Sequence, residues 1–311
     1  MADEATHHLI QYISKEQADR EILSVLMGEM GLTTRKIRSV KWDSQGILLD
    51  GKRAGVRDRV KEGQELKVLL NDTEHKSKHL QPFTMSLDIL YEDEDLLILN
   101  KPSGLVCHPS KGHYNDSLAN GVQAYFDAKG ERSLIHLIGR LDKDTSGIVL
   151  VAKNSVVAER MTVGREQELF TKEYQAIVKG IPDSMEGVIT IPMEEYRDEA
   201  QNGKLIMRKG FTLNAKEAVT HYRVEKKMQG ASLCRLVLDT GRTHQIRFHM
   251  SSIGCPLFGD SLYGNGPESG FDRAALHAHI LRFTHPLTGK PMVIEAPLPE
   301  DMKRFLNSHT Q

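Results

Sequence analysis

The stretch GRLDKDTSGIVLVAKN, residues 139 to 154, decides the fold. Its second half, residues 148–152, is a run of apolar and β-branched side chains bounded by turn residues, which is typical of a buried strand. Its first half is charged, with Arg140, Asp142 and Asp144 in five residues. A fold that contains this stretch must explain why charges stand directly before a core strand.

Hydrophobic periodicity elsewhere predicts a mixture of strands and helices. Short apolar runs predict strands at 96–99, 174–179, 219–225, 233–238 and 292–295. Residues with a helical period predict helices at 117–128, 155–165 and 243–253, the last beginning at Thr243 and ending before Gly254. Strands outnumber helices and do not alternate strictly with them, which favours an α+β fold over a doubly wound α/β fold.

Composition excludes several classes of protein. The chain has 311 residues, of which 39% are hydrophobic and 27% charged, as in ordinary globular proteins. It has no apolar run long enough to span a membrane, and its start, MADEATHH, has no apolar signal segment. The three cysteines are widely spaced and form no C-x-x-C pair, which argues against a disulfide scaffold and fits a reducing compartment. We therefore expect a cytoplasmic protein with no membrane partner.

The first 70 residues predict a small separate domain. Residues 17–31 and 33–42 each predict a helix, the second capped by Thr33 or Thr34, and Asp50-Gly51 predicts a tight hairpin. The polar segment 71–82 lacks either period and predicts a linker. We expect three segments: a domain at 1–75, a linker at 76–84 and a larger domain at 85–311.

This small domain carries a concentrated positive charge. Residues 33–61 contain nine Lys or Arg and three Asp, although the whole chain has a net charge of -1. The candidate RNA-contacting cations are Arg35, Lys36 and Arg38, on the second expected helix. A phosphate-binding surface and an ordinary solvated helix face both fit such a cluster.

The sequence contains no signature of a cofactor or metal site. It has no phosphate-binding glycine loop, no dinucleotide-binding glycine motif, no H-E-x-x-H and no G-x-S-x-G. His277 and His279 would share one face of a strand, but no third ligand accompanies them. We therefore expect a reaction that uses neither a cofactor nor a metal.

Three polar clusters remain as candidates for chemistry, around Asp142, Tyr174 and Arg247. Each has an ordinary structural explanation: Asp142 could stabilise its own turn, Tyr174 could be a strand aromatic, and Arg247 could be a surface charge. Together they suggest a nucleophilic carboxylate in a cleft, because a nearby Arg keeps such a carboxylate ionised and fixes its orientation.

These clusters carry a resemblance to a known family. GRLDKDTSG, KEYQAIVKG and LDTGRTHQIRFHM followed by GCPLFGDSLYG resemble the RluA-type RNA pseudouridine synthases. The opening YEDEDLLILNKPSGLVCHP and the ending ALHAHILRFTHPLTGK resemble the same family in the expected order, so the resemblance spans about residues 85–303. The first 70 residues resemble a divergent form of the S4 RNA-binding module.

The resemblance implies a fold and a set of roles. The fold would be that of pseudouridine synthases, with a mixed, largely antiparallel central sheet. Asp142 would attack the target uridine, through either a covalent sugar adduct or an elimination to a glycal, and Arg247 would pair with it. Tyr174 would pack against the flipped uracil and take the C5 proton. The implied RNA contacts in this domain are Arg140, which would fill the space the base leaves, Arg242 and His244.

One position departs from the family pattern, since many members have His where this chain has Gly139. The activity implied is isomerisation of uridines in structured RNA, with large-subunit ribosomal RNA favoured over transfer RNA, by a monomer. A catalytically silent RNA-binding or assembly factor on the same fold is the alternative. A methyltransferase or deaminase is a weaker one, because their glycine loop and zinc ligands are missing.

Overall fold

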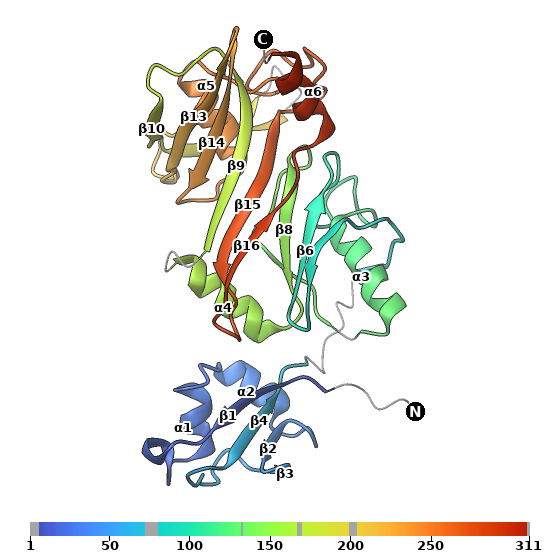
Figure 1. The fold of residues 1–311 in the computed structure, drawn as a ribbon, viewed down its shortest axis with the longest axis vertical. Coiled ribbons are helices and arrows are strands. Elements are labelled where there is room, and N and C mark those ends of the chain that lie inside the picture. Colours follow the sequence, from blue (N-terminus) through green and yellow to red (C-terminus); the bar gives the residue numbers. More distant parts are fainter. Residues whose placement is uncertain (1–5, 72–79, 132, 167–169, 199–203, 310–311) are drawn as a thin grey trace.

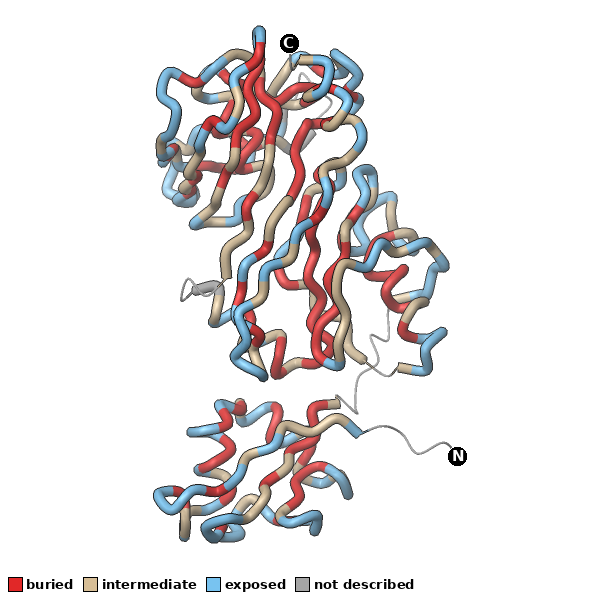
Figure 2. Tube along the Cα trace, in the orientation of Figure 1, coloured by how far each residue is buried: buried red, intermediate tan, exposed pale blue. Residues whose placement is uncertain are grey.

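The computed structural model describes residues 6–71, 80–131, 133–166, 170–198 and 204–309. A large twisted sheet forms the upper part of the molecule in Figure 1, and a small unit built from the first 70 residues lies below it. Each has its own buried core, visible as separate groups of red segments in Figure 2. The expected linker at 76–84 lies partly outside the described residues, so its boundaries stay a prediction.

The large sheet has ten strands. Eight form a continuous path in the order β10-β13-β14-β9-β15-β8-β6-β5, β16 pairs with β15, and β7 pairs with β8. Their bounds are β5 Ile89–Glu92, β6 Leu96–Lys101, β7 His136–Ile138, β8 Ser146–Ala152, β9 Phe170–Lys179, β10 Glu186–Ile189, β13 Thr220–Met228, β14 Ala231–Leu238, β15 Leu276–Thr284 and β16 Pro291–Glu295. The expected α+β fold with a mixed, largely antiparallel sheet is confirmed: among the strands of the described residues, only β8 and β15 pair in parallel.

The close approach of β8 to β15 depends on a glycine. Gly147 lies in β8 at φ +107°, and a Cβ there would come within 2.2 Å of the carbonyl oxygen of Ala278. Every residue of β8 is buried, as its apolar sequence predicts. This strand is therefore a rigid support for the charged segment that precedes it.

Four helices accompany the sheet, and a two-stranded ribbon stands apart from it. The helices are α3 Leu118–Lys129, α4 Ser155–Glu166, α5 Gln245–Ser252 and α6 Glu300–Ser308, and the ribbon pairs β11 Met193–Asp198 with β12 Lys204–Lys209. Helix α5 begins two residues later than Thr243. The reason is that the Gln245 side chain accepts a hydrogen bond from the Arg242 N–H and donates to the Val219 carbonyl, which holds residues 242–244 in a turn.

The N-terminal unit is a four-stranded sheet with two short helices. Its elements are β1 His8–Tyr12, the 3-10 turn η1 Lys15–Gln17, α1 Ile22–Met27, α2 Thr34–Val40, β2 Ile47–Leu49, β3 Lys52–Arg53 and β4 Glu65–Leu69. The Thr33 hydroxyl caps α2, as expected, by accepting a hydrogen bond from the Lys36 N–H. Asp50 and Gly51 both adopt positive φ and close the β2-β3 hairpin.

The expected helix at 17–31 is too long. Helix α1 covers only residues 22–27, because Asp19 adopts a left-handed conformation and the Ile22 and Leu23 N–H groups donate to carbonyls of residues 58 and 56. Contacts outside the helix thus replace the first turn that the periodicity predicts. Among the described residues, no helix is long and apolar enough to cross a bilayer.

Candidate active site

A cavity of about 750 Å³ opens where the segment after β7, the first half of β9, the end of β14 and the start of α5 meet. It collects side chains from segments that are more than 100 residues apart in the sequence. Six of the nine predicted site residues line it, namely Arg140, Asp142, Tyr174, Arg242, His244 and Arg247.

Asp142 lies in a tight turn between β7 and β8. The turn is closed by the backbone, since the Asp142 carbonyl accepts a hydrogen bond from the Thr145 N–H. The carboxylate itself is 22% exposed and lies 4.0 Å from the Arg247 guanidinium. Stabilisation of its own turn therefore does not account for this carboxylate, which faces the cavity.

Two buried cations hold this turn from behind. Lys101, at the end of β6, is fully buried, and its ammonium donates to the carbonyls of Pro102, Leu105 and Lys143. Arg273 donates to the carbonyl of Asp144 and pairs with Asp301 through two nitrogens. Burial lowers the pKa of Lys101 to about 8. Lys101 and Arg273 thus fix the backbone directly after Asp142, at residues 143 and 144, without lining the cavity.

Arg247 projects from α5 and has a stronger partner than the one the resemblance implies. Its Nε and Nη2 donate to the two carboxylate oxygens of Asp260, both at 2.7 Å, whereas Asp142 lies at 4.0 Å. Burial would lower the pKa of Arg247, but Asp260 and then Asp142 raise it. Asp260 thus fixes the guanidinium with two parallel bonds, and the remaining Nη1 faces Asp142.

The rim of the cavity is cationic. Arg140 is exposed and its guanidinium donates to the Thr243 hydroxyl, which joins two predicted clusters across the opening. Arg242 is also exposed and donates from Nε to the Glu217 carbonyl. Both side chains therefore stand where an incoming polyanion would meet them.

The floor is formed partly by β9. Tyr174 is half-buried, lines the cavity, and packs against two of the apolar cores of the large unit. Lys172, two residues earlier on the same face, donates from its ammonium to the Ile148 carbonyl of β8. An aromatic ring fixed in a sheet at the base of a cavity can support a planar ligand.

Two histidines line the same space, and burial favours the neutral form of both. Burial lowers the pKa of His108, and Arg140 lowers it further. Burial also lowers the pKa of His244, against the attraction of the Asp142 carboxylate. Gly139, at the position where the sequence departs from the family pattern, has φ +76° and also lines the cavity. That left-handed backbone favours glycine over histidine.

The three remaining predicted residues lie on α2 in the N-terminal unit. Arg35 and Arg38 are exposed, so they remain available to RNA. The expectation for Lys36 needs correction. It is buried, and its ammonium donates to the carbonyls of Leu70 and Asn71. Because every third or fourth residue of a short helix must face the core, the linear cluster of charges overcounts the exposed ones.

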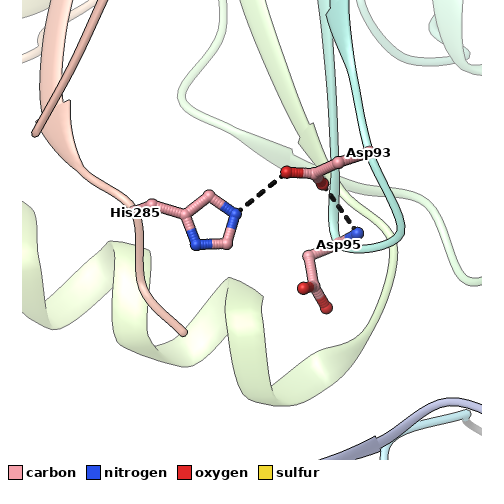
Figure 3. Close-up of side chains that lie close together, drawn as sticks. All are labelled: Asp93, Asp95 and His285. Carbon is pink, nitrogen blue, oxygen red and sulfur yellow. Dashed lines mark hydrogen bonds and ion pairs between the residues drawn. The ribbon is translucent and has the colours of Figure 1, made fainter. Parts of the chain in front are cut away.

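Among the described residues, one group has the spacing of a metal site, Asp93, Asp95 and His285 in Figure 3. Its ligand atoms are already engaged. His285 Nε2 contacts Asp93, while its Nδ1 accepts from the Leu287 and Thr288 N–H groups. Asp95 accepts from Asn154 and contacts His7 of the N-terminal unit. The group forms a hydrogen-bond network that joins the two units, and none of it lines the cavity.

Four further residues of the site, Lys101, Asp260, Tyr263 and Arg273, were not predicted from the sequence. For Lys101, Asp260 and Tyr263 the linear signals are the motifs KPSG and GDSLYG, which mark turns without indicating what the side chains contact, and Arg273 lies in neither motif. Their contacts are made to segments between 13 and 129 residues away. Positions that act through another residue have no chemical signature of their own.

Comparisons with known proteins agree with this geometry. Residues 95–252 match the family model described as RNA pseudouridylate synthase. The chain is 37% identical over 279 residues to the uncharacterized RNA pseudouridine synthase YjbO of Bacillus subtilis, covering 90% of this chain and 96% of that protein. It is 34% identical over 301 residues to ribosomal large subunit pseudouridine synthase D of Escherichia coli, covering 91% and 89%. Human RNA pseudouridylate synthase domain containing 4 superposes with a TM-score of 0.58 at 25% identity, over 71% of this chain and 92% of that one.

Proposed function

The chain belongs to the RNA pseudouridylate synthase family and is an RNA pseudouridine synthase, and from this premise we propose that it isomerises uridines in large-subunit ribosomal RNA with Asp142 as the catalytic carboxylate. The support for the RNA target is the likeness to the Escherichia coli large-subunit enzyme over about nine-tenths of both chains. The observation that carries the catalytic role is the position of the Asp142 carboxylate, at the cavity beside Arg247.

The reaction requires the target base to leave its helix, because a stacked base cannot be turned and rejoined through another atom. Extrusion costs a few kcal/mol. Arg140 at the rim would occupy the space the base leaves, and Tyr174 on the floor would stack on the extruded uracil, an interaction worth ~1–3 kcal/mol. Asp142 would then act at the sugar, by attack on C1′ or by removal of the C2′ proton, while Tyr174 would take the proton that C5 loses.

The N-terminal unit supports this proposal as an S4-like RNA-binding domain within residues 1–75. Two short helices and a hairpin pack around a core that also takes in Val156 of α4, and Arg35 and Arg38 on α2 are exposed. Trp42 lies two residues after the end of α2 and is 76% exposed, with the Lys41 ammonium 4.9 Å from its ring centre. Cations beside an exposed aromatic ring are typical of surfaces that bind RNA without reading its sequence.

We also propose a cytoplasmic location and a monomer. Cys107, Cys234 and Cys255 are all free and buried, which suits a reducing compartment. The exposed large apolar side chains of the described residues come from many separate elements, so they form no obvious self-association face.

Neutralising the α2 cations tests the role of the N-terminal unit. The double variant Arg35→Gln/Arg38→Gln is expected to weaken RNA binding and to reduce the slope of log affinity against log salt by ~1–2, since each lost phosphate contact removes about one unit. Trp42 is the single tryptophan of the chain and reports binding by its fluorescence. The matched control is Lys290→Gln/Arg304→Gln, which removes two exposed cations elsewhere. Equal slopes in both variants would show that the cluster is only a solvated helix face.

The activity itself is tested by tritium release from RNA that carries 5-tritiated uridine. Reattachment of the base through C5 expels the tritium into water, so the wild-type chain is expected to release it from ribosomal RNA of the large subunit. Release from transfer RNA alone would correct the target. RNA binding without release from any cellular RNA would favour the silent assembly factor.

A further inference from the structure

His244 has an unusual backbone for a residue at the mouth of an active site. It precedes α5 with φ 56° and ψ 18°, the left-handed conformation, and its side chain does not cap the helix. Its ring lines the cavity that holds Asp142. A side chain kept in a disfavoured conformation without a capping role calls for another explanation of its orientation.

The orientation of the ring is set by Tyr263. The Met207 N–H of β12 donates to the Tyr263 hydroxyl oxygen at 2.7 Å, and the other recorded partner of that oxygen is His244 Nδ1 at 3.1 Å. A phenol has a single hydrogen to donate, and here the acceptor available to it is Nδ1. With Nδ1 as the acceptor of that hydrogen, the ring proton lies on Nε2.

Tyr263 is itself firmly placed. Its N–H donates to the Asp260 carboxylate, and the Arg247 guanidinium lies 5.4 Å from the centre of its ring. Burial raises the pKa of Tyr263 to about 12, so the phenol keeps its proton at neutral pH. The segment 260–263 thus fixes two neighbours at once, Arg247 through Asp260 and His244 through Tyr263.

We propose that His244 is a further catalytic residue, which donates a hydrogen bond from Nε2–H to a carbonyl oxygen of the target uracil, and that Tyr263 is the positioning residue that fixes this tautomer. The inference rests on the proposed function and deepens it. When the C1′–N1 bond breaks, its electron pair remains with the base, and the negative charge spreads over N1 and the two carbonyl oxygens. A neutral donor stabilises that charge without protonating N1, so C5 remains free to form the new bond to C1′.

Tyr263→Phe tests the positioning role, because it removes only the hydroxyl. The expected result is a tenfold or greater loss in the single-turnover rate of tritium release with unchanged RNA affinity. Tyr196→Phe is the control, since it removes a hydroxyl from β11 of the same ribbon as Met207 but away from the cavity. Unchanged kinetics in both variants, or a loss confined to RNA affinity, would overturn the proposal.

The pH profile gives a second readout that a purely structural role would not move. The charged and titratable groups that face His244 are Asp142, Arg247, Asp260, Arg140 and Tyr263. The Tyr263 hydroxyl favours the neutral ring because it donates to Nδ1. Its removal should raise the pKa of His244, so the acid limb of the rate profile of Tyr263→Phe should move to higher pH. A limb that stays in place would argue against tautomer control.

The tautomer can be observed without any reaction. Nitrogen-15 NMR of histidine-labelled protein should show the Nε2–H form for His244, assigned by loss of its signals in His244→Asn, a substitution that the left-handed backbone tolerates. Tyr263→Phe should convert these signals to a mixture of both tautomers. An Nδ1–H signal in the wild type would overturn the proposal. If the wild-type protein were inactive on every RNA but still showed the Nε2–H signal of His244, the proposed function would be refuted and the tautomer would not.

Discussion

Asp142→Asn is expected to reduce tritium release by more than about 10³-fold, the scale seen when a nucleophile is removed. The amide has almost the same size as the carboxylate, but it can neither bond to C1′ nor accept a proton from C2′. The turn itself should persist, because it is closed by the backbone and anchored by Lys101 and Arg273. RNA affinity, followed through Trp42 fluorescence, should therefore stay close to that of the wild type.

Asp144→Asn is the matched control for this prediction. Asp144 lies in the same turn but does not line the cavity, so its variant should keep nearly full turnover. Tritium release by Asp142→Asn at a rate near that of the wild type would show that the family is right and the nucleophile wrong. A loss of equal size in both variants would indicate damage to the turn instead of lost chemistry.

Arg247→Ala is expected to lower both stability and turnover. Asp260 has no exposed surface and loses its bidentate partner, so a buried charge remains uncompensated. Removal of one member of such a pair costs about 3–5 kcal/mol of unfolding free energy. Turnover should fall as well, because the cation that faces Asp142 at 4.0 Å is lost. Urea unfolding and tritium release measure the two effects separately.

The double variant Arg247→Met/Asp260→Leu separates the two effects. It removes both buried charges, so part of the stability should return while turnover stays low. Recovery stays partial because the Leu262 and Tyr263 N–H groups lose Asp260 as their acceptor. Recovery of turnover together with stability would show that Arg247 acts only through the fold. A stability change below about 1 kcal/mol in Arg247→Ala would contradict the buried pair itself.

The fold was predictable from the sequence wherever burial of one face of a helix or strand determines the spacing of its apolar residues. The strand at residues 148–152 is part of β8, and the parallel pairing that depends on Gly147 could not be read from it. Helix α1 is shorter than its periodicity predicts because contacts with residues 56–58 replace its first turn. Local patterns carry no information about such distant backbone contacts.

The candidate site was predictable to a similar depth. Asp142, Tyr174 and Arg247 meet at one cavity, as the motifs indicate, although their individual roles remain predictions. The partner of Arg247 was not predictable, because Asp260 and Asp142 are both acidic residues in turn segments and only the folded geometry ranks them. Lys36 was predicted to contact RNA because it lies in a basic run, but its ammonium is buried and donates to two backbone carbonyls, which the sequence alone does not indicate.

The anchoring of the Asp142 turn by Lys101 and Arg273 bears on how such a protein can be re-engineered. The side chains that fix the position of the Asp142 carboxylate lie outside the cavity lining, whereas the cations that would contact the RNA lie on the cavity rim. Selection for a new substrate can therefore randomise Arg140, Arg242 and their neighbours as one library. Such variants would keep the catalytic carboxylate and its anchoring residues, and only the residues that contact the RNA substrate would change.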